Sequence, residues 1–220
     1  MKLHKNISQQ IEAINVKENM PLIISDVDEV LVHFASPLES FLDTHNIAIS
    51  FKSYKLFGNV HFKETKELVC DETIMELLDV FFTEKLHTCP PVVGVKNALN
   101  NLKKKYQIII LTNTPFEARE SRIKSLNNLG IDFPLVTNTG HKGEAVSEIC
   151  KNLKAPALFL DDIPTHHKSV AQLAPHVHRV HFVADPRLAK LLPPAVDSHE
   201  RIDNWPEAEL YISNFFTNSR

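Results

Sequence analysis

Short apolar segments recur along the chain, and segments rich in helix-forming residues lie between them. Each apolar segment is mostly β-branched or aromatic and ends at polar residues, which is typical of buried strands in a parallel sheet. These predicted strands are residues 21–25, 107–111, 134–138, 157–160 and 179–183. The predicted helices are residues 95–106, 117–129, 142–153 and 167–173. This alternation predicts an α/β fold, a Rossmann-like doubly wound parallel sheet.

One interval is too long for a simple crossover between strands. About eighty residues separate the first predicted strand from the second, and a crossover needs far fewer. Helical patches at 37–45 and 71–86 favour an inserted helical cap domain over residues 36–88. Residues 1–35 and 89–220 would then form the α/β core.

The composition of the 220 residues is that of an ordinary globular protein, with 43% hydrophobic and 23% charged residues. A net charge of −3 gives no reason to expect a nucleic acid polymer or a membrane as partner. The polar N-terminus lacks a signal-peptide pattern, and three widely spaced cysteines form no disulfide framework. We therefore expect a cytoplasmic protein. The sequence leaves its oligomeric state open.

Polar side chains follow three of the predicted strands, at the point where each strand ends. Asp26 and Asp28 follow the first, Thr112 and Asn113 the second, and the pair Asp161–Asp162 a later one. Open α/β sheets bind ligands beyond the carboxyl ends of their strands, so we expect these groups to share one crevice. Taken singly, each motif is also typical of a turn or a helix cap. Their joint order favours a site.

Four carboxylates in one crevice repel one another unless a cation or protons neutralise them. The sequence therefore predicts a metal site at Asp26, Asp28, Asp161 and Asp162. Mg²⁺ prefers oxygen ligands and suits phosphoryl transfer, although Ca²⁺ or Mn²⁺ could use the same ligands. Lys142 begins a predicted helix and would add the positive charge that a phosphate needs.

The ordered set of motifs resembles the haloacid dehalogenase superfamily of aspartate-nucleophile phosphatases. IISDVDEVL is similar to the first motif, IIILTN to the second, Lys142 in HKGEAV to the third and ALFLDD to the fourth. An insertion between the first two motifs is where this family places its helical C1-type cap. The resemblance covers roughly residues 21–183 and implies a magnesium-dependent phosphatase that acts on a small phosphorylated metabolite.

The resemblance also implies a role for each matching residue. Asp26 would be the nucleophile that becomes phospho-aspartate, and Asp28 would act as acid and then base while its carbonyl binds Mg²⁺. Thr112 and Lys142 would complete the catalytic set and, with Asn113, bind the phosphoryl group. Asp162 would bind the metal directly, and Asp161 through water.

Two residues depart from the family pattern. Glu29 stands where the family usually has glycine, and His166 where it commonly has an acid or asparagine. Glu29 keeps open the alternative of a catalytically weak regulatory or binding member of the family. A phosphotransferase or mutase is a second alternative, because it shares all four motifs.

Two further expectations concern the substrate and the remaining histidines. DVDEVLVHF is similar to the first motif of the family's nucleotidases, so a nucleotide monophosphate is one candidate substrate. The inserted cap would select the substrate through side chains such as Phe51, Tyr54, Phe57 and Phe62. We interpret His176, His178 and His181 as surface or strand-edge residues rather than metal ligands, because they do not share one strand face.

Overall fold

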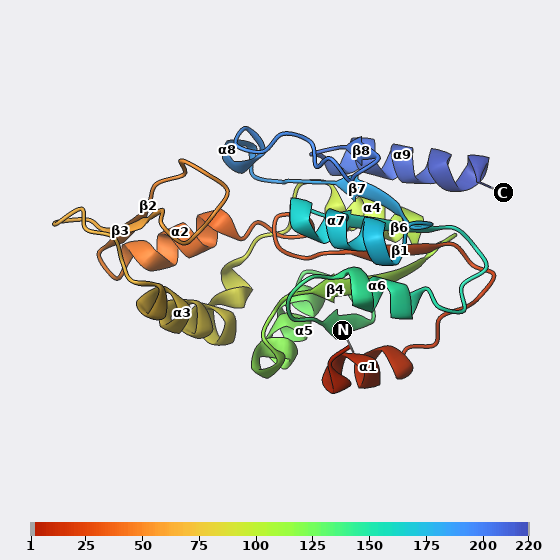
Figure 1. Cartoon of the computed structure of the whole chain (residues 1–220), viewed down its shortest axis with the longest axis horizontal. Coiled ribbons are helices and arrows are strands. Elements are labelled where there is room, and N and C mark those ends of the chain that lie inside the picture. Colours follow the sequence, from red (N-terminus) through yellow and green to blue (C-terminus); the bar gives the residue numbers. More distant parts are fainter. Residues whose placement is uncertain (1–2, 220) are drawn as a thin grey trace.

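The computed structural model describes residues 3–219 and has a six-stranded parallel sheet at its centre (Figure 1). The strand order is β5-β4-β1-β6-β7-β8. The strands are β1 (Leu22–Ser25), β4 (Gln107–Thr112), β5 (Leu135–Thr137), β6 (Ala157–Asp161), β7 (His178–His181) and β8 (Glu200–Arg201). The predicted α/β sheet is therefore confirmed, and β8 is an edge strand that the sequence did not predict.

Helices cover both faces of the sheet, as a doubly wound fold requires. One face carries α1 (Lys5–Glu12), α6 (Gly143–Ile149) and α7 (Pro164–Leu173), and the other carries α4 (Val95–Leu102), α5 (Arg119–Asn128) and α9 (Trp205–Asn218). Alternate residues of β1 point to opposite faces: Leu22 and Ile24 pack with α1 and α6, whereas Ile23 packs with α4 and α9. Both faces are apolar because both are covered.

The helices in the core differ from their predicted ranges mainly at their ends. The predicted helix at 142–153 ends at Ile149, and the one at 167–173 begins three residues earlier, at Pro164. A 3₁₀ turn (Phe116–Ala118) precedes α5. The helices α1, α8 (Pro186–Ala189) and α9 lie in segments for which the apolar pattern gave no prediction.

Residues 36–88, which we call the lobe, lie beyond one end of the sheet (Figure 1). The lobe contains α2 (Ala35–Asp43) and α3 (Asp71–Val80), followed by a π-helical turn (Phe81–Lys85) and a 3₁₀ turn (Leu86–Thr88). Between the helices, β2 (Ile47–Ile49) pairs antiparallel with β3 (Val60–Phe62). The helical patches are present as expected, and the small sheet is an addition. Such a short strand pair is stable only when packed on other elements, and here Ile47 and Val60 are buried in the same cluster as α2.

No helix within residues 3–219 is long and apolar enough to cross a membrane.

Candidate active site

The acids of the first and fourth motifs emerge side by side because β1 and β6 are neighbours in register. Ser25 pairs with Leu160, so Asp26 and Asp161 leave the same edge of the sheet. Between them lies Lys142, whose Nζ is 2.6 Å from Oδ1 of Asp26 and 2.7 Å from Oδ2 of Asp161. All three side chains are buried. The structure thus brings together three of the residues that the sequence singled out.

Lys142 reaches this position because α6 and α7 approach each other very closely at the next residue. A Cβ atom on Gly143 would lie 2.3 Å from the carbonyl oxygen of Ser169, so only glycine fits there. The Ser169 hydroxyl accepts a hydrogen bond from the Gly143 N–H at 3.0 Å. This contact fixes the start of α6 and with it the direction of the lysine.

Burial and crowding of like charges set the protonation of the cluster. Burial raises the pKa of Asp26 to about 7; the Lys142 ammonium opposes this rise, and the charges of Asp161 and Asp28 add to it. Burial also raises the pKa of Asp162 well above its usual range, and the Asp26 and Asp161 carboxylates contribute. At Asp161, burial acts to raise the pKa, but Lys142 together with His166 and His167 outweighs burial, so the pKa is lowered. Lys142 itself has a raised pKa because its two carboxylate partners outweigh its burial.

Asp26, Asp161 and Asp162 each offer a carboxylate oxygen within 4.8 Å of the other two. Both oxygens of Asp161 are engaged, one by Lys142 and one by the N–H of Ile163 at 2.8 Å. Asp162 differs, because its Oδ1 is buried without a hydrogen-bond partner. An unpaired buried carboxylate oxygen beside two further acids is a donor set that fits a divalent cation.

Two histidines that the sequence analysis did not connect with the site hold the backbone of the acidic pair. His167 Nε2 lies 2.9 Å from the carbonyl oxygen of Asp161, and His181 Nε2 lies 2.9 Å from that of Asp162. His181 Nδ1 accepts the N–H of Ala195 at 3.0 Å, so its Nε2 is the protonated nitrogen and donates. His181 is fully buried, and its interpretation as a surface or strand-edge residue was wrong.

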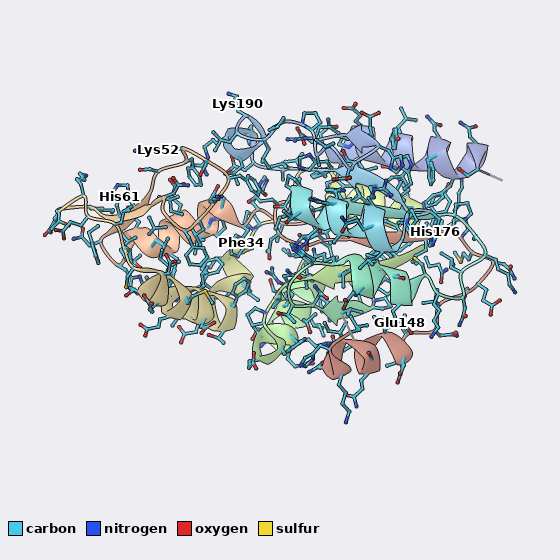
Figure 2. All side chains as sticks on the ribbon, viewed as in Figure 1. Phe34, Lys52, His61, Glu148, His176 and Lys190 are labelled. Carbon is cyan, nitrogen blue, oxygen red and sulfur yellow. The ribbon has the colours of Figure 1, made fainter. Side chains whose placement is uncertain are left out.

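Figure 2 shows His176 at the end of the molecule away from the lobe, and His178 lies between the His199 and Phe215 rings at 4.3 and 4.2 Å. Neither belongs to the acidic cluster.

Asp28 lines the same cavity as Asp26, but its carboxylate is paired with a cation that sequence reasoning missed. Nη2 of Arg122, on α5, lies 2.8 Å from both carboxylate oxygens of Asp28. Arg122 is completely buried, and its Nε donates to Thr114 Oγ1 at 3.0 Å. One signal was available: Arg122 is spaced four residues from both Ala118 and Leu126, so it falls on the apolar face of its helix.

The second motif reaches the site in part. Asn113 lines the cavity, and its side-chain amide donates to the carbonyl oxygen of Gly140 at 2.9 Å. The Thr112 side chain is fully buried at the end of β4, with its hydroxyl 3.1 Å from that of Thr114. Phosphoryl binding by Thr112, Asn113 and Lys142 stays a prediction.

The backbone conformation of Glu29 is one that would suit the glycine expected at this position from the resemblance. Glu29 has a φ of 57°, in the left-handed region that glycine adopts most easily. Its carboxylate accepts hydrogen bonds from the N–H groups of Phe34 and Ala35, both 2.8 Å, and of Asp185, at 2.9 Å. The extra acid therefore fastens the start of α2 to the core instead of adding a free charge to the site.

A cavity of about 290 Å³ lies between the core and the lobe. From the core, Asp26, Asp28, Lys142 and Asp162 line it. His166 also lines it, and both of its ring nitrogens are buried without a partner. Burial lowers the pKa of His166 to about 4, so its ring is neutral near pH 7. A larger hollow, about 600 Å³, lies on the lobe beside α2, but none of the strand-end acids lines it.

The lobe closes the cavity from the other side. The half-buried Tyr54 donates its hydroxyl to Oδ2 of Asp162, which ties the lobe directly to the acidic cluster. Figure 2 labels Phe34 where the lobe joins the core, and this residue lines the cavity with Phe51. Phe57 and Phe62, which we also expected to line the pocket, are exposed and do not.

Several solved structures with the same architecture are described as haloacid dehalogenase-like hydrolases. A hydrolase from Deinococcus radiodurans, solved with bound phosphate and sodium, has a TM-score of 0.61 and is 12% identical, over 90% of this chain and 97% of that one. A haloacid dehalogenase-like hydrolase from Streptococcus pneumoniae has a TM-score of 0.59 and 14% identity, over 88% and 98%. A putative β-phosphoglucomutase from Thermotoga maritima has a TM-score of 0.56 and 15% identity, over 89% and 99%. The chain thus has the haloacid dehalogenase-like fold.

No curated protein matches the sequence. Residues 2–163 match the family model described as a protein of unknown function (DUF2608), and the chain belongs to this family.

Proposed function

We propose that this protein is a magnesium-dependent phosphatase that hydrolyses a small phosphorylated substrate through a phospho-aspartate on Asp26. The observation that carries the proposal is the buried Lys142 ammonium, which contacts Asp26 and Asp161 at the end of two neighbouring strands. A carboxylate nucleophile beside a fixed cation, in a closed cavity, is suited to phosphoryl transfer. The bound phosphate in the similar Deinococcus structure agrees with a phosphate ligand.

The metal would be held by Asp26, Asp162 and the backbone carbonyl of Asp28, with Asp161 contributing through water. The hydrogen bonds support this division, because Asp161 has both oxygens engaged, whereas Asp162 keeps one unpaired. When bound, Mg²⁺ would neutralise negative charge on the phosphoryl group and on the acids.

The residues of the chain would act in two steps. In the first, a carboxylate oxygen of Asp26 attacks phosphorus, the bond to the alcohol oxygen breaks, and Asp28 gives that oxygen a proton. In the second, Asp28 takes a proton from water, whose oxygen attacks phosphorus and releases inorganic phosphate and Asp26. Lys142 and Thr112 would hold phosphoryl oxygens during both steps. To work as the acid, Asp28 must loosen its ion pair with Arg122 and take up a proton.

The lobe would exclude water from the first step and select the substrate. Its Tyr54–Asp162 contact and its share of the cavity lining support this role. Exclusion of water strengthens the charge interactions within the site.

A phosphotransferase or mutase would use the same residues, and one similar structure carries that description. A regulatory protein without turnover is less well supported, because the carboxylate of Glu29 is fully occupied by backbone N–H groups.

The test is a panel of phosphorylated metabolites, nucleotide monophosphates among them, incubated with the protein and Mg²⁺. Release of free phosphate supports the hydrolase. A phosphorylated acceptor in place of free phosphate identifies a transferase. Absence of turnover with every ester, acetyl phosphate included, contradicts both.

A further inference from the structure

We propose that the alcohol part of the substrate is compact and apolar, such as a carbocyclic or aromatic alcohol, and is not a sugar or a nucleoside. This inference rests on the proposed function, since it concerns what the cavity holds next to the phosphoryl group. Its basis is a difference in polarity between the two walls of the cavity, one formed by the core and the other by the lobe.

The wall facing the acids is apolar almost throughout. Six hydrophobic side chains between residues 34 and 82 line it: Phe34, Leu38, Ile49, Phe51, Leu56 and Phe82. They come from the N-cap and first turn of α2, from β2, from the loop after β2 and from the π-helical turn, so several elements of the lobe form the surface. Leu188, from α8 of the core, continues it.

The polar atoms that this wall does possess are already engaged. The carboxylate of Glu29 accepts three backbone N–H groups, and the Tyr54 hydroxyl donates to Asp162. The hydroxyl of Ser53 accepts a hydrogen bond from Asn59 at 2.8 Å. Among the described residues of the lobe that line the cavity, Lys55 is the only charged one, and its exposed side chain stays hydrated. On the lobe side a sugar would therefore find few partners for its hydroxyls, because the unpaired polar atoms of the cavity, on His166 and Asp162, belong to the core.

The size of the cavity also favours a compact alcohol. About 290 Å³ lies at the lower end of the range for ligand pockets, and part of this volume must hold the phosphoryl group. A single ring fits the remainder better than a nucleoside with its base and ribose.

For two rings of equal size, polarity decides which one binds more tightly in the cavity. Each sugar hydroxyl that enters without a hydrogen-bond partner loses its contacts with water, which weakens binding by about tenfold. An apolar ring gains affinity from the same surface because its own apolar area leaves water. Both effects favour the apolar ring, and an apolar pocket rejects an analogue that adds a hydroxyl by on the order of a hundredfold.

The test compares two esters that differ in polarity but not in the type of leaving group. Cyclohexylmethyl phosphate and glucose 6-phosphate are both six-membered rings that carry phosphate on a primary alcohol. With the full-length protein and Mg²⁺, we expect kcat/KM for cyclohexylmethyl phosphate to exceed that for glucose 6-phosphate by at least about a hundredfold, from two or more unpaired hydroxyls. Adenosine monophosphate should also be a poor substrate. Hydrolysis transfers phosphate to water, and the products are the free alcohol and inorganic phosphate.

Two conservative variants assign the preference to the lobe. Ile49→Thr and Leu56→Asn each add a polar group to the apolar wall; Leu56→Asn keeps the number of side-chain heavy atoms, and Ile49→Thr removes one. Each should lower kcat/KM for cyclohexylmethyl phosphate by about tenfold and leave acetyl phosphate, whose leaving group is very small, almost unchanged. Leu68→Asn is the matched control, because Leu68 is an exposed lobe residue that does not line the cavity. It should behave like the parent protein.

The outcomes separate failure of this inference from failure of the proposed function. If glucose 6-phosphate or adenosine monophosphate is hydrolysed with the same kcat/KM as cyclohexylmethyl phosphate, the inference about the substrate is wrong, whereas the proposed phosphatase activity is supported. Equal losses for all esters in the lobe variants also contradict it. If no ester releases phosphate, acetyl phosphate included, both the proposed function and the inference fall.

Discussion

Arg122 Nη2 lies 2.8 Å from both carboxylate oxygens of Asp28, and this pair connects the first motif to helix α5. The Phe82 ring, from the lobe, lies 5.9 Å from the guanidinium. Arg122 is completely buried, whereas the Asp28 side chain is 23% exposed and lines the cavity. Asp28 therefore has two functions. It neutralises the buried charge of Arg122, which contributes to stability, and in the proposed mechanism it donates and accepts a proton.

A double-variant experiment separates these functions. Asp28→Asn leaves the Arg122 charge without its partner and should lower the free energy of unfolding by on the order of 3 kcal/mol. Asp28→Asn combined with Arg122→Met removes both charges and should recover most of this loss, measured by urea denaturation. Neither variant should release phosphate. Activity in the double variant would show that Asp28 matters for stability alone.

The nucleophile gives a simpler prediction. Asp26→Asn is nearly isosteric and leaves Lys142 paired with Asp161, so the fold should persist by circular dichroism. Phosphate release should fall by a factor on the order of a thousand or more. Asp132→Asn changes an exposed acid and serves as the control. A variant of Asp26 that keeps a tenth of the parent rate would exclude the phospho-aspartate mechanism.

The site residues at the strand ends could be predicted because ligands of open α/β sheets bind beyond the carboxyl ends of the strands. Each apolar run stops at the carboxyl end of its strand, so Asp26, Thr112 and Asp161 could be placed there without knowledge of the strand order, although all three side chains are buried. The local pattern does not contain the pairing of β1 with β6, so the shared crevice was an expectation that depended on these strands being neighbours.

The contacts that the sequence did not predict join distant parts of the chain. Tyr54 and Asp162 are 108 residues apart, and Arg122 and Asp28 are 94 apart. A sequence pattern shows the hydrophobic periodicity of one helix or strand, but it does not show which other element packs against it. The strands β2 and β3 were missed for a related reason, because three residues are too few to show an alternation.

The variant Tyr54→Phe tests whether the Tyr54 hydroxyl alone holds the lobe over the site. Tyr54→Phe removes only the hydrogen bond to Asp162, worth about 1 kcal/mol, and should make opening of the lobe about fivefold easier. Hydrogen exchange in peptides covering β2 and β3 should accelerate by that factor, while β1 and β6 stay unchanged. Equal exchange rates in parent and variant would mean that other contacts hold the lobe.

Metal binding can be measured without turnover. A ligand at 100 times its Kd adds about 2.7 kcal/mol to stability, so Mg²⁺ should raise the Tm by roughly 5–10 °C after exhaustive chelation. Asp162→Asn should abolish this shift, because Asp162 holds the unpaired carboxylate oxygen. Asp79→Asn, at an exposed acid of the lobe, should retain it. A Tm that does not respond to Mg²⁺ in the parent protein would contradict the proposed metal site.

The packing of α9 against β7 predicts a loss of stability in mild acid. Burial, with the nearby His199 and Arg179, lowers the pKa of His178 from an ordinary 6.5 to about 4. Below pH 6.5 the unfolded chain takes up a proton that the folded protein does not, so stability is present above this pH and is lost as the pH falls towards 4. For this partly exposed side chain we expect a loss of about 1 kcal/mol between pH 7 and pH 5, or roughly 2–4 °C in Tm.

The variant His178→Phe isolates this contribution because it keeps a ring between His199 and Phe215 but cannot take up a proton. Its Tm should fall less steeply from pH 7 to pH 5 than that of the parent protein. The exposed His176 provides the control, since His176→Gln should leave the slope unchanged. If the parent and His178→Phe lose stability equally over this range, His178 is not the group that titrates, and the buried histidines beside the acidic pair are the next to examine.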